Sequence, residues 1–279
     1  MGNLKTIRTR IASVHNTKKI TKAMNMVSAA KLRKSERRLL DLRPYAHGLS
    51  DLIVKMNYHL QSEHPFYSER KEGKPLFVFI SADKGLCGSF NSYVIRRARK
   101  LLAENPDSQS VLIGKNIRNY FKRFNIPFLH TYSDVFNVVT FDIAQEIGGY
   151  LADLYLNDLS ISKIIIVYNR FKNSVLSETS EEQFLPRVKD IQETKTIYEI
   201  EPDAGTLLTA LMKEYLKAEV LRILLESLTS EHGARMAAMD AATENADEMI
   251  RKLTLKANRE RQSIITTEIS EIVGGANAL

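Results

Sequence analysis

The longest regular pattern of apolar residues lies in the last part of the chain, from Leu207 to Leu279. No proline interrupts this stretch. The spacing, in steps of three and four residues, is typical of the buried stripe of a coiled coil. The stripe comprises Met239, Ala242, Ala246, Met249 and Leu253 and, nearer the end, Ile265, Ile269 and Ile272. We predict one helix over residues 206–279, roughly 105 Å long at 1.5 Å per residue.

The first 58 residues show the same spacing. Apolar residues recur at Leu4, Ile7, Ile11 and Val14, the pattern slips at Thr17 and Lys18, and it resumes at Ile20, Met24, Val27, Leu42, Tyr45, Leu49, Leu52 and Met56. Pro44 should kink or break this helix near Asp41 to Arg43. We expect the helices over 1–58 and 206–279 to pack against each other as an antiparallel coiled coil within one chain. The alternative is that each pairs with another copy.

The period changes between these helices, after a polar connector that ends near Gly73. Leu76 to Ile80 is a continuous apolar run, as expected of a buried parallel strand. We predict strands near 75–81, 110–114 and 163–171, a weak strand over 127–130, a returning antiparallel strand within 174–186, and helices over 90–102, 117–124 and 141–156. Alternating strands and helices predict a Rossmann-like α/β domain over residues 59–205.

Composition indicates a folded protein, with 44% apolar and 26% charged residues among 279. Cys87 is the only cysteine, which excludes an internal disulfide and a cysteine-based zinc site. The six histidines lack metal-ligand spacing. No apolar run approaches the roughly 20 residues that span a bilayer. We therefore expect a soluble intracellular protein without cofactor or metal.

Candidate catalytic chemistry is sparse. Gly85 to Gly88 form a glycine-rich turn after the first strand, but the turn matches neither the Rossmann fingerprint nor the P-loop motif. Asp83 beside Lys84 is expected to be a solvated charge pair. Cys87 has no base in a recognisable context that would make it a nucleophile. We predict a non-catalytic chain, and a nucleotide-dependent enzyme that uses this turn is one alternative.

Positive charge gathers in the first helix. Residues 1–58 hold 13 Lys+Arg and 3 Asp+Glu, a net charge of +10, against +7 for the whole chain. Lys31, Arg33, Lys34, Arg37 and Arg38 could bind nucleic acid, so a basic coiled-coil nucleic-acid-binding protein is an alternative. However, no aromatic residue precedes Tyr45, so stacking residues are not interleaved with the charge. An acidic protein partner fits the charge equally well.

Four blocks of sequence resemble those of a known family. They are residues 11–33, the turn 81–91, the stretch 230–246 and the stretch from 258–262 through 272–276. Together they make the chain similar, over essentially its whole length, to the gamma subunit of F-type ATP synthase. The resemblance implies a non-catalytic central-stalk rotor that couples proton flow through the membrane sector to ATP synthesis or hydrolysis on the beta subunits.

The same resemblance implies partners and a location. The shaft would turn inside the ring of three alpha and three beta subunits, one copy per complex, while the α/β body would contact the epsilon subunit and the c-ring. The complex would be peripheral to the cytoplasmic side of a bacterial cell membrane, and the chain would bind no nucleic acid.

Residue roles follow by matching positions in the family's motifs. Met24, Arg261, Gln262 and Thr266 match contacts to the beta subunit, and Tyr198 and Glu201 match contacts to the c-ring. An apolar bearing tip would comprise Ile265, Ile269, Ile272 and Val273. The last eight residues carry no charged side chain, which suits a tip turning in an apolar sleeve. A frayed apolar C-terminus explains that composition equally well.

Overall fold

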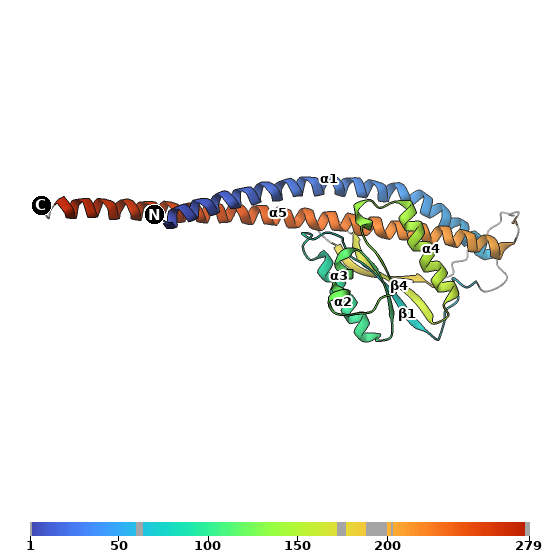
Figure 1. Ribbon diagram of the computed structural model, residues 1–279. Coiled ribbons are helices and arrows are strands. Elements are labelled where there is room, and N and C mark those ends of the chain that lie inside the picture. Colours follow the sequence, from blue (N-terminus) through green and yellow to red (C-terminus); the bar gives the residue numbers. More distant parts are fainter. Residues whose placement is uncertain (1, 60–63, 172–176, 188–199, 202, 277–279) are drawn as a thin grey trace. The chain divides into compact units, whose positions relative to one another are not determined.

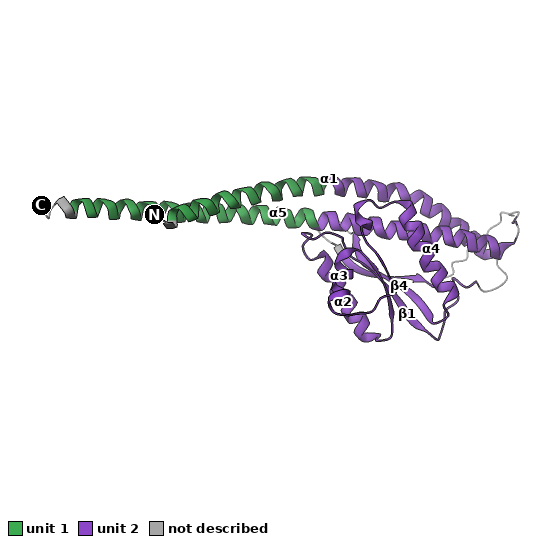
Figure 2. Cartoon of the chain, in the orientation of Figure 1, with its two compact units in different colours: residues 1–29, 235–279 green, residues 30–234 purple. Residues whose placement is uncertain are grey.

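The computed structural model describes every residue except 1, 60–63, 172–176, 188–199, 202 and 277–279. Its helices are α1 Gly2–His59, α2 Phe90–Glu104, α3 Lys115–Arg123, the 3₁₀ helix η1 Val135–Asn137, α4 Phe141–Asn157 and α5 Ala204–Ala276. Its strands are β1 Lys74–Ile80, β2 Gln109–Ile113, β3 His130–Tyr132, β4 Ile161–Phe171 and β5 Ser177–Leu185. Contacts divide the chain into unit 1, residues 1–29 with 235–279, and unit 2, residues 30–234 (Figure 2).

Unit 2 contains one five-stranded sheet with the strand order β3-β2-β1-β4-β5. β1, β2, β3 and β4 run parallel, and β5 runs antiparallel to β4. Helices α2 and α3 cover one face of the sheet, and α4 and α5 cover the other (Figure 1). The predicted combination of a Rossmann-like α/β domain with long terminal helices is confirmed.

Strand β1 shows why its sequence is apolar throughout. Leu76, Val78 and Ile80 point into the larger core, which α1, α4 and α5 complete. Phe77 and Phe79 point to the opposite face, into a smaller core with α2 and α3. Successive side chains of a strand alternate between faces, so covering both faces requires an apolar residue at every position.

One local expectation was wrong, and of the kink or break expected at Pro44 the break does not occur. The third strand is His130–Tyr132, not 127–130. Pro127 has no N–H to donate to a ladder, and the side chain of Phe128 packs on the smaller core. Pro44 does not break α1, which is continuous through it. Pro44 and Leu40 are both exposed, so the backbone hydrogen bond that proline removes lies on the solvent side of the helix.

The buried stripe of the long helices also differs from the prediction. Eight residues assigned to it are exposed by 42–71%: Ile20, Val27, Tyr45, Leu52, Met249, Ile265, Ile269 and Ile272. The steps of three and four do not slip at Lys18 but continue through polar residues, namely Lys18, Thr21, Asn25 and Ser28. On α5 the stripe passes through Thr243 and Ile250. Polar residues can occupy positions in the stripe because the facing helix supplies hydrogen-bond or ion-pair partners.

Candidate functional site

Unit 1 is an antiparallel helical hairpin made by the start of α1 and the second half of α5. Three polar contacts join the two helices. Lys18 Nζ lies 2.5 Å from Asp247 Oδ1, the hydroxyls of Thr21 and Thr243 are 2.8 Å apart, and Asn25 Nδ2 donates to the carbonyl of Met236 at 3.0 Å. Residue numbers rise on one helix as they fall on the other, so the predicted antiparallel packing within one chain is confirmed.

Electrostatics favour the contact between Lys18 and Asp247. The hydrogen bond from the Lys18 ammonium, together with its charge, lowers the pKa of the Asp247 carboxyl. Because both side chains are about one-third exposed, solvent screens the pair and its effect on stability is small. Its main effect is on geometry, since an ion pair within the stripe favours the register that joins the two charges.

The α1 segment of unit 1 presents unneutralised positive charge. Residues 1–29 hold six Lys+Arg and no Asp or Glu. Apart from Lys18, these side chains have no ion-pair partner within the described residues: Lys5, Arg8, Arg10, Lys19 and Lys22. They are all exposed. The exposed surface of this segment is suited to an acidic partner.

The residues matched to beta-subunit contacts do not form one patch. Met24 is half-buried on α1, next to the Asn25–Met236 contact. Arg261 and Gln262 are exposed on α5, and 25 residues separate Met236 from Arg261, which corresponds to roughly 37 Å along a helix. The exposed Thr266 hydroxyl donates to the Gln262 carbonyl at 2.9 Å. Met24 therefore belongs to one level of the hairpin and the α5 residues to another.

The end of α5 extends beyond the start of α1 within unit 1. Leu4 and Ile264 line one shallow groove, and α5 continues from there to Ala276. The apolar side chains of this extension are strongly exposed: Ile265 47%, Ile269 55%, Ile272 71% and Val273 53%. A row of branched apolar side chains in water marks a surface that binds another protein.

Only part of the region matched to the c-ring contacts can be placed. Tyr198 lies outside the described residues. Glu201 is exposed, and Ile200 packs on the larger core. Asp203 begins α5, because its carboxylate accepts hydrogen bonds from the backbone N–H and the hydroxyl of Thr206. These hydrogen bonds, and chiefly the one from the backbone N–H, lower the pKa of Asp203.

The glycine-rich turn and the aspartate before it have a structural role. Asp83 is half-buried, and its carboxylate accepts hydrogen bonds from the backbone N–H groups of Lys115, Asp134 and Phe136 at 2.9–3.0 Å. The expectation of a solvated Asp83–Lys84 pair was wrong, since Asp83 joins the end of β1 to the start of α3 and to η1. Gly88 at φ 57° adopts a left-handed conformation suited to glycine.

Across the described part of the chain, no group of three or more His, Cys, Asp or Glu side chains could hold a metal ion. Among the helices as described, none is long and apolar enough to cross a bilayer.

Sequence reasoning missed the hairpin's polar contacts. Thr21 and Asn25 continue the steps of three and four from Lys18, and Thr243 stands four residues from Met239. Counting only apolar residues makes these positions look like interruptions. A search for complementary polar residues at matching positions of the two stripes could have found them.

Comparisons with known proteins agree with this architecture. The family model described as ATP synthase matches residues 3–279. The ATP synthase gamma chain of Desulfitobacterium hafniense is 38% identical over 281 residues, covering 100% of both chains. That of Symbiobacterium thermophilum is 39% identical over 287 residues, covering 99% of this chain and 98% of the relative.

Solved structures are similar as well. A chain of the Tetrahymena thermophila mitochondrial ATP synthase central stalk and c-ring structure matches with a TM-score of 0.65 and 26% identity, covering 80% of this chain and 99% of that chain. A chain of the Euglena gracilis mitochondrial ATP synthase matches in fold with a TM-score of 0.72 and 20% identity, covering 99% and 94%. The chain therefore belongs to the family of ATP synthase gamma chains, the subunits of the enzyme's central stalk.

Proposed function

We propose that this chain is the rotor shaft of a proton-translocating ATP synthase. It turns inside a ring of three alpha and three beta subunits and couples proton flow through the membrane sector to ATP synthesis or hydrolysis on beta. The observation that carries the proposal is unit 1: a helical hairpin whose α1 segment carries exposed, unneutralised positive charge, extended by a single helix with exposed apolar side chains. The nucleic-acid-binding alternative gains no support from the relatives.

The positive charge of the α1 segment supports contact with an acidic lever of the beta subunit, at the level of Met24. Arg261, Gln262 and Thr266 make the second contact with beta. Because roughly 37 Å of α5 separates the two levels, we expect them to engage different segments of the surrounding ring, so that one level can be altered without removing the other.

The exposed apolar tip, comprising Ile265, Ile269, Ile272 and Val273, supports a bearing. Ion pairs and hydrogen bonds are directional and would favour particular angles of rotation, whereas apolar contact is non-directional. A helix end that presents apolar side chains can therefore turn inside an apolar sleeve without fixed stops.

In this proposal residues 1–58 and 206–279 form the shaft and residues 59–205 form the foot. The foot binds the epsilon subunit and, through Tyr198 and Glu201, the c-ring. The chain itself is non-catalytic and holds no cofactor. One copy serves each complex, peripheral to the cytoplasmic side of a bacterial cell membrane.

Co-purification and rotation test the proposal. The chain, expressed with its alpha and beta subunits, should appear once per three alpha–beta pairs, and a probe attached to it should rotate during ATP hydrolysis. ATP binding by the isolated chain would support an enzyme instead. Tight DNA or RNA binding at physiological salt, without association with alpha and beta, would support the nucleic-acid-binding alternative.

The bearing has its own test. Ile269→Ser combined with Ile272→Ser should leave the melting temperature of the free chain unchanged, because both side chains are already exposed, and should weaken assembly with the hexamer. Leu159→Ser, at a side chain 76% exposed in unit 2, is the matched control and should change neither. Equal assembly by the double variant and the wild type would contradict the bearing.

A further inference from the structure

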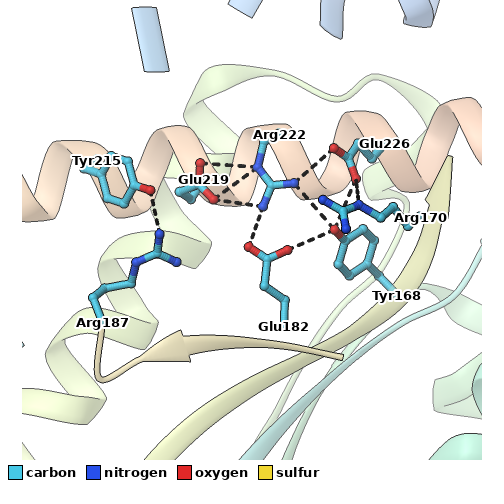
Figure 3. Close-up of polar contacts among 8 residues, drawn as sticks. All are labelled: Tyr168, Arg170, Glu182, Arg187, Tyr215, Glu219, Arg222 and Glu226. Carbon is cyan, nitrogen blue, oxygen red and sulfur yellow. Dashed lines mark hydrogen bonds and ion pairs between the residues drawn. The ribbon is translucent and has the colours of Figure 1, made fainter. Parts of the chain in front are cut away.

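A buried ionic network joins α5 to the last two strands of the sheet in unit 2. Arg222 lies at its centre (Figure 3). Its Nη2 donates to Glu182 Oε1 of β5 at 2.6 Å, its Nη1 donates to Glu226 at 3.0 Å, and its Nε and Nη2 both donate to Glu219. All three guanidinium nitrogens are thus engaged by carboxylates.

Tyr168 of β4 completes the connection. Its hydroxyl lies 3.0 Å from Glu182 and 3.1 Å from Glu226, so it lies between a carboxylate of the sheet and a carboxylate of the helix. Burial, with the neighbouring carboxylates, raises the pKa of Tyr168, which keeps it a neutral donor. Arg170 Nε lies 3.9 Å from Glu226. The contacts therefore tie one face of α5 to both β4 and β5.

The network is poorly solvated. The side chains of Glu219, Glu226 and Arg222 are 9%, 14% and 20% exposed. Burial acts to raise the pKa of Glu182, but the charge and hydrogen bond of Arg222 outweigh it, so the pKa of Glu182 is lowered. Arg222 is thus the cation that keeps this carboxylate ionised.

The surroundings of α5 explain why a directional contact matters here. From Ala218 to Gly233 every residue is buried except Arg222 and Glu226, which are half-buried. From Val220 to Leu225 every residue except Arg222 is apolar, so in this short stretch the sides of the helix that face away from Glu219, Arg222 and Glu226 are apolar. Packing of this kind holds the helix in place but discriminates weakly between its rotational settings.

Glu219, Arg222 and Glu226 stand three and four residues apart, so they share one face of the helix. A guanidinium that forks between carboxylates has a fixed planar geometry. We propose that Arg222 is a positioning residue that sets the rotational position of α5 on β4 and β5. On the proposed rotor function, twist applied to the sheet then passes into α5 instead of being lost as rotation of the helix within its apolar surroundings.

The free full-length chain tests the positioning itself, independently of the rotor function. Spin labels on cysteines replacing the exposed residues Arg99 of α2 and Ala210 of α5 report the distance between helix and body. The wild type should give one narrow distribution, and Arg222→Met should broaden it, since methionine has no N–H to donate to the carboxylates of Glu182, Glu219 and Glu226. Arg222→Lys, which keeps the charge but not the fork, should fall between them.

A matched control separates positioning from the loss of any charge. Lys213→Met removes an exposed ion pair between α5 and Asp153 of α4, 3.0 Å long, and should leave the distribution narrow. If Arg222→Met fails to fold, Glu182→Gln removes the same link from the sheet side and should broaden the distribution in the same direction. An unchanged width in Arg222→Met, or in Glu182→Gln when Arg222→Met does not fold, would overturn the proposal.

The transmission of twist is tested in the assembled hexamer. A bead is attached to the cysteine at position 99, and the variance of its angle is measured while the enzyme is held at a catalytic pause. Angular variance should rise in Arg222→Met, because thermal fluctuation grows as a restraint softens and methionine supplies no directional contact. A wild type that does not rotate would refute the rotor function and leave the distance result standing. A variant that rotates with wild-type variance would refute the role of Arg222 in transmitting twist.

Discussion

The pair of threonines inside the hairpin of unit 1 gives a quantitative test of its polar stripe. Thr21 is 8% exposed, and its hydroxyl lies 2.8 Å from that of Thr243. Thr243 donates its single proton to the Met239 carbonyl at 2.7 Å. Thr21 has an acceptor of its own in the Lys18 carbonyl, but at the longer distance of 3.1 Å, so we assign Thr21 as the donor between the two hydroxyls.

Valine replaces threonine with nearly the same shape and no hydroxyl. Thr21→Val leaves the Thr243 oxygen without its donor across the stripe and should cost about 1 kcal/mol. Thr243→Val should cost less, roughly 0.5 kcal/mol, because the Thr21 proton can turn to the Lys18 carbonyl. The double variant leaves two methyl groups in contact and no unpaired group, so it should be close to neutral. The coupling energy is then on the order of 1 kcal/mol.

Native-state hydrogen exchange of the backbone amides of residues 11–28 measures the free energy of opening in unit 1 without unfolding the whole chain. Thr254→Val is the control, since that hydroxyl is exposed and donates within its own helix to the Ile250 carbonyl. It should change the opening free energy by less than about 0.5 kcal/mol. A double variant whose cost equals the sum of the two single costs would refute the reasoning.

Three further predictions concern other positions. Gly114→Ala should lower the free energy of unfolding in urea by more than about 2 kcal/mol, because φ is +99° and an added Cβ would lie 2.0 Å from the Ser81 carbonyl oxygen. Gly149→Ala is its control. That glycine has open space around it within α4, so the substitution should raise the free energy of unfolding by about 0.5–1 kcal/mol. Burial lowers the pKa of His64 below its ordinary 6.5, so the unfolded chain binds the proton more tightly and the melting temperature should fall as the pH drops below about 6.5, less so in His64→Gln. Met24→Lys should impair ATP-driven proton pumping more than assembly of the complex, and equal pumping by wild-type and variant membranes would count against the proposed beta-subunit contact.

The sequence predicted those parts of the fold that local patterns encode. The continuous apolar runs at β1 and β4 and the alternation of strands with helices identified the α/β domain, because covering both faces of a sheet constrains every residue of a strand. The long helices could be predicted because steps of three and four residues persist over many turns. The turn around Gly85 was recognised, but the role of Asp83 depends on backbone groups more than 30 residues away.

The site was less predictable for a related reason. Arg222, Glu182 and Tyr168 are separated by 40 and 14 residues, so no local spacing connects them. In the hairpin, the error at Ile20 and Met249 arose from treating apolar character as the only mark of a buried position. Polar side chains are buried where partners meet them, and the partner of Thr21 lies 222 residues away. Only the fold brings such pairs together.

The two parts of α5 suggest one physical rule for a long helix that must keep a defined register and rotational position. In unit 2 its buried side chains between Val220 and Leu225 are leucine, isoleucine and valine, and in unit 1 its stripe includes a buried alanine, Ala246. In both places a shifted or rotated helix would exchange one apolar side chain for another at little cost. The contacts that distinguish the native register and rotation are polar. They are the hydrogen bonds of the Arg222 guanidinium in unit 2 and the Thr21–Thr243 pair in unit 1. Apolar burial therefore supplies the stability of this helix, while a few directional groups define its register and rotation.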